Sequence, residues 1–238
     1  MTLLEKLLFL ARDIHARKIY PQMRRHVHGT VLDVGGWDFY LTAKRKRFNF
    51  DHWTTLEHSP ERVLQISDPK FQLVVGDGCQ MQFAAESFDT VLNLQVLEHV
   101  FEPIRMVQEV GRVLKPNGIA IFLIPQTGTL HMAPHHYYNF TRYWIEEALH
   151  RSKLKIIDLK PIGGVWATIG SRMIYFFLQS FRATGRSSED CKRNALFYIL
   201  FPFMTLYALL SIPLVLVLSL GDLTEEANNH FVIAKKLL

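Results

Sequence analysis

From residue 30 onward, short apolar segments alternate with amphipathic ones, and this alternation constrains the fold more than any other feature. Strands are predicted at 30–34, 53–56, 71–75, 88–94, 119–124, 154–159 and 229–234, and helices at 103–114 and 143–150. Strands that are apolar along their whole length are typical of a sheet covered on both faces. The pattern therefore predicts an α/β fold with a doubly wound, parallel, seven-stranded sheet.

A long apolar block interrupts this pattern before the last strand. Residues 165–181 contain Arg172 as their single charged side chain, and residues 195–220 run for 26 residues without a charge. A run of this length is sufficient for a transmembrane helix. The strands on either side belong to one sheet, so the chain must leave and return on the same side, and a single crossing is excluded.

Two crossings are disfavoured by charge and by proline. They would place residues 182–194, with a net charge of +2, across the membrane and against the positive-inside tendency. Arg172 would cost about 2.5 kcal/mol or more at the centre of a spanning helix. Pro202 and Pro213 favour a bent or re-entrant path. We therefore expect residues 165–228 to be a hydrophobic helical insertion that rests in one leaflet as a hairpin or a shallow re-entrant element; a lid over the sheet or a dimer interface is the alternative.

The positive charge of the chain is concentrated near its beginning. Residues 1–47 hold ten basic and four acidic side chains, whereas residues 48–238 sum to −1. Residues 2–20 have the spacing of an amphipathic helix ending near Tyr20-Pro21, which either packs on its own domain or lies on an anionic membrane surface. The predicted organisation is an amphipathic basic helix (1–27), an α/β domain (28–164 with 229–238) and the insertion (165–228).

Polar and glycine residues follow four of the strands, at the edge where doubly wound sheets bind ligands. They are Asp33, Gly35 and Gly36 after the first strand, Glu57 after the second, Asp77 and Gly78 after the third, and Asn93 and Gln95 at the end of the fourth. Glycines let a ligand approach the backbone closely. Glu57 follows Gly36 by 21 residues, a spacing that suits an acid accepting hydrogen bonds from ribose hydroxyls.

Five segments in this order resemble those of class I S-adenosylmethionine-dependent methyltransferases of the small-molecule and lipid branch. They are Val31-Leu32-Asp33-Val34-Gly35-Gly36, Gly76-Asp77-Gly78, Phe88-Asp89-Thr90-Val91, Val96-Leu97-Glu98-His99-Val100 and Arg112-Val113-Leu114-Lys115-Pro116-Asn117-Gly118. The resemblance covers residues 28–162 and a terminal strand near 230–236. It implies a Rossmann-like seven-stranded methyltransferase sheet with the hydrophobic insertion before its last strand, and S-adenosylmethionine as the cofactor.

The resemblance also implies roles for the residues at the strand ends. It assigns Asp33, Gly35 and Gly36 to the methionine part of the cofactor, Glu57 to both ribose hydroxyls, Asp77 (beside Gly78) to the adenine amino group, Cys79 to the adenine pocket, and Asn93 and Gln95 to the surroundings of the sulfonium and the acceptor. The chain departs from the family in the first loop, where Gly35-Gly36-Trp37-Asp38 replaces three spaced glycines.

Histidines are the candidates for acid–base work at the acceptor. Methyl transfer to a hydroxyl requires an aligned acceptor and removal of its proton, a task that suits histidine near neutral pH. The candidates are His99, His131, His135 and His136; for His99, a backbone hydrogen bond at a helix start is the structural alternative. The spacing of His131, His135 and His136 would allow a metal, but none is expected, because no carboxylate or cysteine is near and Pro134 breaks any helix that would align these histidines.

The predicted function is methyl transfer from S-adenosylmethionine, O-directed, to a lipophilic or lipid-linked acceptor such as a glycan carrier. The membrane surface would be contacted through residues 1–27 and 165–220, on the cytoplasmic face. One alternative is a membrane-docked binding protein that has the fold without turnover. Another is a soluble nucleic-acid methyltransferase, although Asn93-Leu94-Gln95-Val96 lacks the Asn/Asp-Pro-Pro-aromatic segment of base N-methyltransferases, so no nucleic-acid partner is expected.

Overall fold

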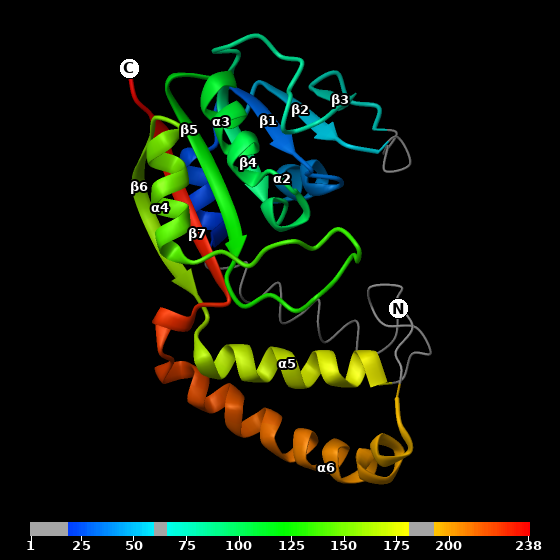
Figure 1. The fold of residues 1–238 in the computed structure, drawn as a ribbon. Helices are drawn as coiled ribbons and strands as arrows, with labels where there is room; N and C mark the ends of the chain where they lie inside the picture. Colours follow the sequence, from blue (N-terminus) through cyan, green and yellow to red (C-terminus); the bar gives the residue numbers. More distant parts are fainter. Residues whose placement is uncertain (1–18, 60–65, 181–192) are drawn as a thin grey trace.

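The computed structural model describes residues 19–59, 66–180 and 193–238. Its strands are β1 (Thr30–Val34), β2 (His52–Glu57), β3 (Phe71–Val75), β4 (Phe88–Leu94), β5 (Leu114–Pro125), β6 (Leu154–Ile162) and β7 (Asn229–Lys236). Its helices are α2 (Phe39–Arg45), α3 (Pro103–Val113), α4 (Arg142–Arg151), α5 (Val165–Ser180) and α6 (Ala195–Leu218), with 3₁₀ turns η2 (Leu97–His99), η3 (Ser219–Gly221) and η4 (Thr224–Glu226). The seven strands form one sheet in the order β3-β2-β1-β4-β5-β7-β6 (Figure 1). This arrangement confirms the predicted Rossmann-like seven-stranded fold.

The sheet is mixed rather than fully parallel, which corrects the prediction. β1 to β5 pair in parallel, whereas β7 pairs antiparallel with both β5 and β6. The chain leaves the sheet at Ile162 and returns at Asn229, two residues that lie opposite each other in the register. A strand that re-enters at the edge its predecessor has just left must run in the reverse direction.

β5 begins earlier than predicted. Leu114 already pairs with Phe88, and the register then shifts before pairing resumes between Thr90 and Ile119. The segment from Lys115 to Gly118, which reads as a turn in the sequence, is therefore a bulge within the strand rather than a boundary before it.

Two apolar layers cover the faces of the sheet. One contains Val107 and Val110 of α3 and Ile145 and Leu149 of α4, packed against one face of β4 and β5. The other contains Tyr40 and Ala43 of α2 together with Ile19, Met23 and Val27, packed against the opposite face. The central strands β1, β4, β5 and β7 therefore have an apolar environment on both sides, as the continuous apolar segments predicted, whereas the outer strands β3 and β6 are partly exposed.

The N-terminal helix does not end at Tyr20-Pro21 as predicted. Residues 19–26 are helical, and Ile19, Met23 and Val27 are buried at a spacing of four residues. Burial of this stripe holds the helix on the sheet beyond Pro21, so packing outweighs the local effect of a proline. The remainder of the predicted 2–20 helix lies outside the described residues.

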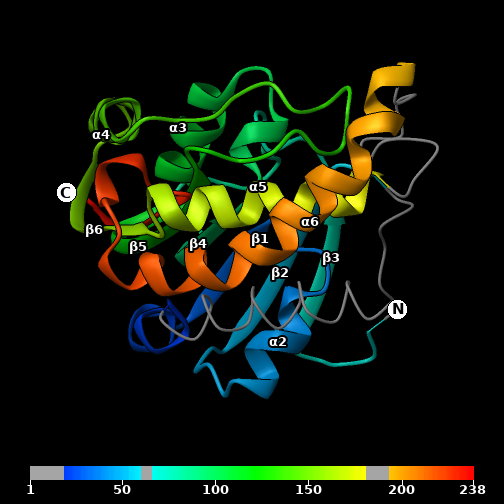
Figure 2. The ribbon, with the colours of Figure 1, turned by 90° about the horizontal axis from the view of Figure 1, so that it is seen from below.

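α5 and α6 form a helical hairpin across the edge of the sheet at which the parallel strands end (Figures 1 and 2). Asp222 holds the start of α5, because its carboxylate accepts hydrogen bonds from the backbone N–H groups of Trp166 (2.8 Å) and Ala167 (2.9 Å). This satisfies two of the N–H groups that a helix leaves without an intrahelical partner. α6 continues through Pro202 and Pro213. The insertion is thus a helical hairpin, and its resting in one leaflet stays a prediction.

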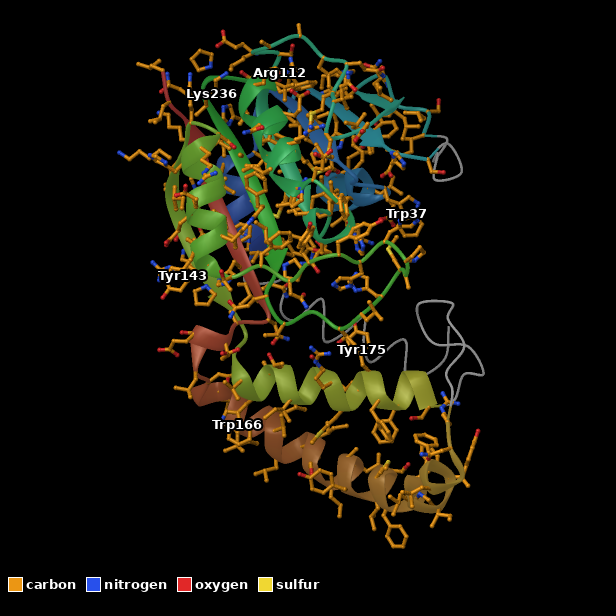
Figure 3. All side chains as sticks on the ribbon, in the orientation of Figure 1. Trp37, Arg112, Tyr143, Trp166, Tyr175 and Lys236 are labelled. Atoms are coloured by element: carbon orange, nitrogen blue, oxygen red, sulfur yellow. The ribbon has the colours of Figure 1, made fainter. Side chains whose placement is uncertain are left out.

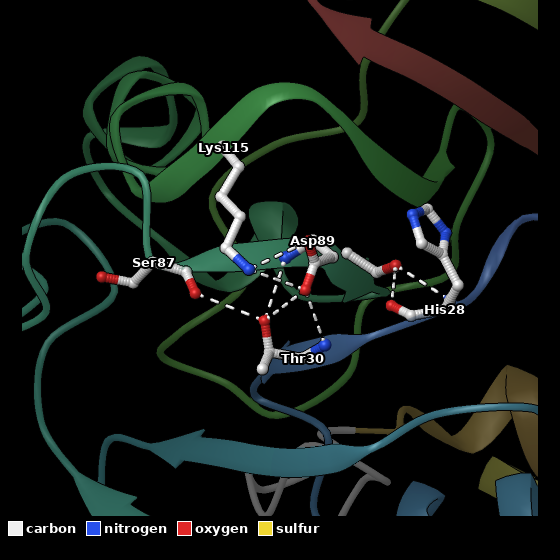
Figure 4. Close-up of polar contacts among 6 residues, drawn as sticks. His28, Thr30, Ser87, Asp89 and Lys115 are labelled. Atoms are coloured by element: carbon white, nitrogen blue, oxygen red, sulfur yellow. Dashed lines mark hydrogen bonds and ion pairs between the residues drawn. The ribbon is translucent and has the colours of Figure 1, made fainter.

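The opposite edge of the sheet is closed by an ionic network at Asp89 (Figure 4). The Asp89 carboxylate accepts hydrogen bonds from the Thr30 backbone N–H (2.9 Å) and hydroxyl (2.7 Å), and from the Lys115 ammonium (2.9 Å). Partial burial acts to raise the pKa of Asp89, but the contacts with Lys115 and Thr30 outweigh it and lower the pKa to about 2. This network fixes the start of β1 against β4, far from the edge at which ligands bind.

Candidate cofactor and acceptor site

Asp33 lies near the end of β1 and is fully buried. Neither of its carboxylate oxygens makes a hydrogen bond of ordinary geometry with the described residues. Burial raises the pKa of Asp33 well above its usual value, and the nearby Glu57 carboxylate raises it further. A buried carboxylate without a partner is costly, so this side chain is suited to a ligand that brings a donor or a positive charge.

The turn after β1, residues 35–37, contacts the carboxylates of Asp33 and Glu57. Gly35 has φ +67°, and a Cβ on Gly36 would lie 1.9 Å from an Asp33 carboxylate oxygen, so residue 36 must be glycine. The Trp37 backbone N–H donates to Glu57 Oε1 at 2.6 Å, which joins the ends of β1 and β2. Figure 3 shows Trp37 at this edge of the sheet, with Arg112 and Lys236 at the opposite one.

Asp77, Gly78 and Cys79 form the next part of the edge, after β3. Asp77 is exposed and accepts the Cys79 backbone N–H at 2.8 Å, which fixes the turn. A Cβ on Gly78 would lie 2.5 Å from the Met106 Cε atom, so this turn packs closely on α3. Burial raises the pKa of Cys79 to about 11, with the Asp77 charge adding to the effect. The Cys79 thiol is therefore neutral near pH 7 and suited to lining a pocket rather than to nucleophilic work.

Asn93 and Gln95 face different surroundings although they are two residues apart. Asn93 is buried, with its Nδ2 3.2 Å from the Met106 sulfur and its Oδ1 without a hydrogen-bond partner. Gln95 has φ +59° and donates from Nε2 to Asn229 Oδ1 at 2.7 Å. Asn93 thus retains an unused acceptor oxygen beneath α3, whereas Gln95 ties the end of β4 to the first residue of β7.

Three of the four predicted histidines gather in one cluster. The ring centroid of His99 lies 4.7 Å from that of His131 and 5.7 Å from that of His136, and His131 lies 4.6 Å from His136. His135 is separate: its ring nitrogen contacts the Tyr137 hydroxyl at 3.1 Å, and only its backbone carbonyl reaches the cluster, where it accepts from His99 Nδ1 at 2.5 Å. Residues 131 and 136 follow β5, and His99 follows β4, so two strand ends build the cluster.

Glu98 belongs to this cluster and was missed by the sequence argument. Its side chain is fully buried, its two carboxylate oxygens make no hydrogen bond with the described residues, and Oε1 lies 3.8 Å from His99 Nε2. Burial raises the pKa of Glu98 to about 7. A carboxylate therefore does lie beside His131 in space, and the ground on which a metal was excluded is wrong. The Glu98-His99 pair directly after a buried strand was the available signal.

The hairpin is attached to the loop that carries these histidines. Arg172 of α5 donates to the carbonyl oxygens of Thr127 (3.1 Å) and Gly128 (3.4 Å). The Thr127 hydroxyl also lies 2.9 Å from the Thr168 hydroxyl. Arg172, treated in the sequence argument as a cost within a spanning helix, is a contact between the hairpin and the acceptor side of the sheet.

The roles predicted for the individual side chains stay predictions, but the fit to a cofactor with a cationic methionine end is good. Asp33 and Asn93 have buried side-chain oxygens without a hydrogen-bond partner among the described residues, and Gly36 places no side chain against the Asp33 carboxylate. S-adenosylmethionine supplies a sulfonium, an ammonium group and ribose hydroxyls, which are the complementary donors and charges.

Comparisons with known proteins agree with this geometry. Residues 32–122 match the family model described as a methyltransferase domain. An uncharacterized methyltransferase of Mycobacteroides abscessus is 33% identical over 98 residues, covering 39% of this chain and 38% of that protein. The chloroplastic 2-methyl-6-phytyl-1,4-hydroquinone methyltransferase 2 of Oryza sativa subsp. japonica is 25% identical over 167 residues, covering 65% and 44% respectively. The chain thus aligns with less than half of the length of either relative.

Two further similarities concern a shorter segment and the fold. The ubiquinone biosynthesis O-methyltransferase of Histophilus somni is 40% identical over 67 residues, covering 27% of each protein. The methyltransferase solved in complex with the Haloferax volcanii Trm112 activator superposes with a TM-score of 0.62 at 16% identity, covering 94% of this chain and 89% of that one. Residues 32–122 thus match a methyltransferase domain, and the sheet has the Rossmann-like fold of S-adenosylmethionine-dependent methyltransferases.

Proposed function

We propose that this protein transfers a methyl group from S-adenosylmethionine to a hydroxyl of a lipophilic or lipid-linked acceptor at a membrane surface. The observation that carries the proposal is that the cofactor edge of the sheet and an exposed apolar helix lie on the same side of the molecule (Figures 1 and 2). Arg172 links the two parts, because it joins α5 to the loop after β5. An acceptor held in a lipid layer would thereby be presented to the sheet edge.

The residues at the sheet edge form two groups, one that would bind the cofactor and one that would bind the acceptor. Asp33, Glu57 and Asn93 supply buried acceptor oxygens to the cofactor, which brings the transferable methyl group on its sulfonium. The imidazoles of His99, His131 and His136 lie together at the acceptor side and are suited to hold the proton that a hydroxyl gives up. The names of two relatives, a hydroquinone methyltransferase and a ubiquinone biosynthesis O-methyltransferase, support a lipophilic quinone-type acceptor, and the second name supports methylation at oxygen.

The dimensions of the hairpin support docking from one side rather than crossing. Residues 195–221 form a helix long and apolar enough to cross a membrane, and 11% of its most apolar window is buried. α5, however, has 16 residues, a length of about 24 Å, short of the roughly 30 Å hydrocarbon core. Because both ends of the hairpin return to the same sheet edge, α6 would lie in one leaflet with α5 between it and the sheet. The basic residues within 1–47 would favour the anionic cytoplasmic face.

The test is methyl transfer from labelled S-adenosylmethionine with a membrane fraction as the source of acceptor. We expect label in the organic extract with the wild-type protein and its loss with Asp33→Ala. Asp51→Ala, a change of an exposed acid at the start of β2, is the matched control and should leave the label unchanged. Absence of label in the extract with the wild-type protein, or equal label with Asp33→Ala, would contradict the proposal.

One observation favours the second candidate, a membrane-docked protein without turnover. Trp37 stands where the family has a glycine, has φ +44°, and its N–H occupies Glu57 Oε1, the carboxylate expected to hold the ribose. Under this candidate, S-adenosylhomocysteine binds but no acceptor from membranes or nucleic acid is labelled. Replacement of Trp37 by glycine would then raise the affinity for S-adenosylhomocysteine.

A further inference from the structure

Glu98, His99 and His131 bring three metal-ligand atoms together at the acceptor side of the sheet. One carboxylate oxygen and one ring nitrogen from each histidine all lie within 4.8 Å of one another. Glu98 and His99 belong to η2, directly after β4, whereas His131 lies in the loop after β5. The fold therefore assembles the group from segments about thirty residues apart, as metal sites commonly do.

The hydrogen bonds of the two histidines prepare their rings for metal binding. His99 Nδ1 lies 2.5 Å from the His135 carbonyl oxygen, and His131 Nδ1 lies 2.8 Å from the Thr129 carbonyl oxygen. A carbonyl can only accept, so each Nδ1 carries a hydrogen and each neutral ring has its lone pair on Nε2. Histidines that bind metals almost always donate their other ring nitrogen to a carbonyl or carboxylate in this way.

Glu98 is the second, independent observation that points to a cation. Its side chain is fully buried, and neither carboxylate oxygen makes a hydrogen bond within the described part of the chain. Burying a carboxylate without compensation is expensive, and proteins meet the cost with a paired charge or a metal ion. His99 Nε2 lies 3.8 Å from Glu98 Oε1, a separation too long for a hydrogen bond but suitable for two ligands of one ion.

We propose that Glu98, His99 and His131 bind a divalent transition-metal ion, with Zn²⁺ as the probe. Two imidazoles and one carboxylate form a donor set typical of Zn²⁺ and other first-row ions rather than of Mg²⁺ or Ca²⁺, which prefer oxygen ligands. With bonds of about 2.0–2.2 Å, the ligand atoms would draw together by about 1 Å on binding. Three protein ligands leave a position open for an oxygen ligand.

The open position gives the metal a role that rests on the proposed function. An acceptor hydroxyl bound there would lose its proton more readily, because a metal ion lowers the pKa of an oxygen ligand. The proton would then pass to solvent or to His136, whose ring lies beside His131 and outside the three ligands. Metal binding by Glu98, His99 and His131 does not depend on this role in catalysis.

The test is Zn²⁺ binding to the full chain in detergent, after removal of bound metal with a chelator, measured by competition with a chromophoric chelator. We expect one ion per chain for the wild type and at least a tenfold weaker affinity for Glu98→Gln and for His131→Ala. His150→Ala changes an exposed histidine on α4 and should bind as the wild type does. Binding of Co²⁺ should give the visible spectrum of a nitrogen–oxygen site in the wild type, and this spectrum should be lost in both variants.

Three results would overturn the proposal: no binding of Zn²⁺ or Co²⁺, equal binding by the wild type and both variants, or saturation by Mg²⁺ in preference to Zn²⁺. The affinity for S-adenosylhomocysteine, measured on the same samples, shows whether the variants are folded. Zn²⁺ binding without methyl transfer to any lipid would contradict the proposed function while supporting the metal site. Methyl transfer without Zn²⁺ binding would do the reverse.

Discussion

The central strands and α6 are both strongly apolar, but they place their side chains in opposite environments. Phe122 of β5 is 0% exposed between the two faces of the sheet, whereas Leu209 of α6 is 58% exposed. The strands have helices on both sides, while α6 has α5 on one side and no described residue over most of its surface (Figure 3). A helix that is apolar all round belongs in a protein core or in lipid, and α6 has little core around it. Exposure, and not composition, therefore distinguishes the two regions.

The largest expected difference between the regions is in stability. Phe122→Ala should lower the free energy of unfolding by about 3–5 kcal/mol, because it removes a fully buried ring and leaves a cavity. Leu209→Ala should change it by about 0.5 kcal/mol or less, as exposed positions do. Urea unfolding in detergent, followed by tryptophan fluorescence, checks both values. A cost above 2 kcal/mol for Leu209→Ala would show that α6 is packed in a core and would remove the distinction.

A second prediction concerns the turn after β1, which belongs to the sheet and not to the hairpin. Gly36→Ala would push a Cβ against the Asp33 carboxylate and should weaken S-adenosylhomocysteine binding at least tenfold in isothermal titration. Gly221→Ala is the matched control: a Cβ there meets nothing within 4 Å, so the affinity should stay unchanged. Equal affinities of Gly36→Ala and the wild type would show that the cofactor does not use this turn.

The smallest effect is expected at the junction of the two regions. Asp222→Ala removes the carboxylate that holds the first N–H groups of α5 and should cost about 1 kcal/mol of stability. Because Asp222 lies beside the end of β6, at the other end of the sheet from the ends of β1 and β2, the affinity for S-adenosylhomocysteine should be unaffected. Hydrogen exchange of the Trp166 and Ala167 amides would rise in the variant, and unchanged protection there would contradict the capping role.

The fold could be predicted further than the site, for a physical reason. β1, β3 and β4 have the predicted bounds because glycines, polar residues or turns end their apolar runs locally. β7 could not be oriented from its own residues, because its direction depends on where the hairpin returns the chain. The bulge at residues 115–118 could not be predicted for a similar reason, because it depends on a distant partner. Its sequence is that of a turn, and only pairing with β4 shows that β5 has already begun.

Within the site, local signals were again the ones that could be read from the sequence. Asp33, Gly36 and Glu57 lie at strand ends and meet there through the parallel register. Gln95 was expected near the sulfonium and the acceptor, and that role stays a prediction; the contact of its side-chain amide with Asn229, 134 residues away, could not be read from the sequence. Glu98 was passed over because its burial depends on the loop after β5, which no local pattern places over η2.

Docking of α6 on a membrane is tested most directly by flotation of the full chain with vesicles of phosphatidylcholine and anionic phosphatidylglycerol. Leu206, Leu210 and Leu214 of α6 are exposed, so changing all three to aspartate should leave the sheet intact while removing the apolar surface. We expect the wild type to float with the vesicles and the triple variant to remain at the bottom. Both should bind S-adenosylhomocysteine with equal affinity. Wild-type protein that stays at the bottom, or a triple variant that floats equally well, would contradict docking of α6 on a membrane.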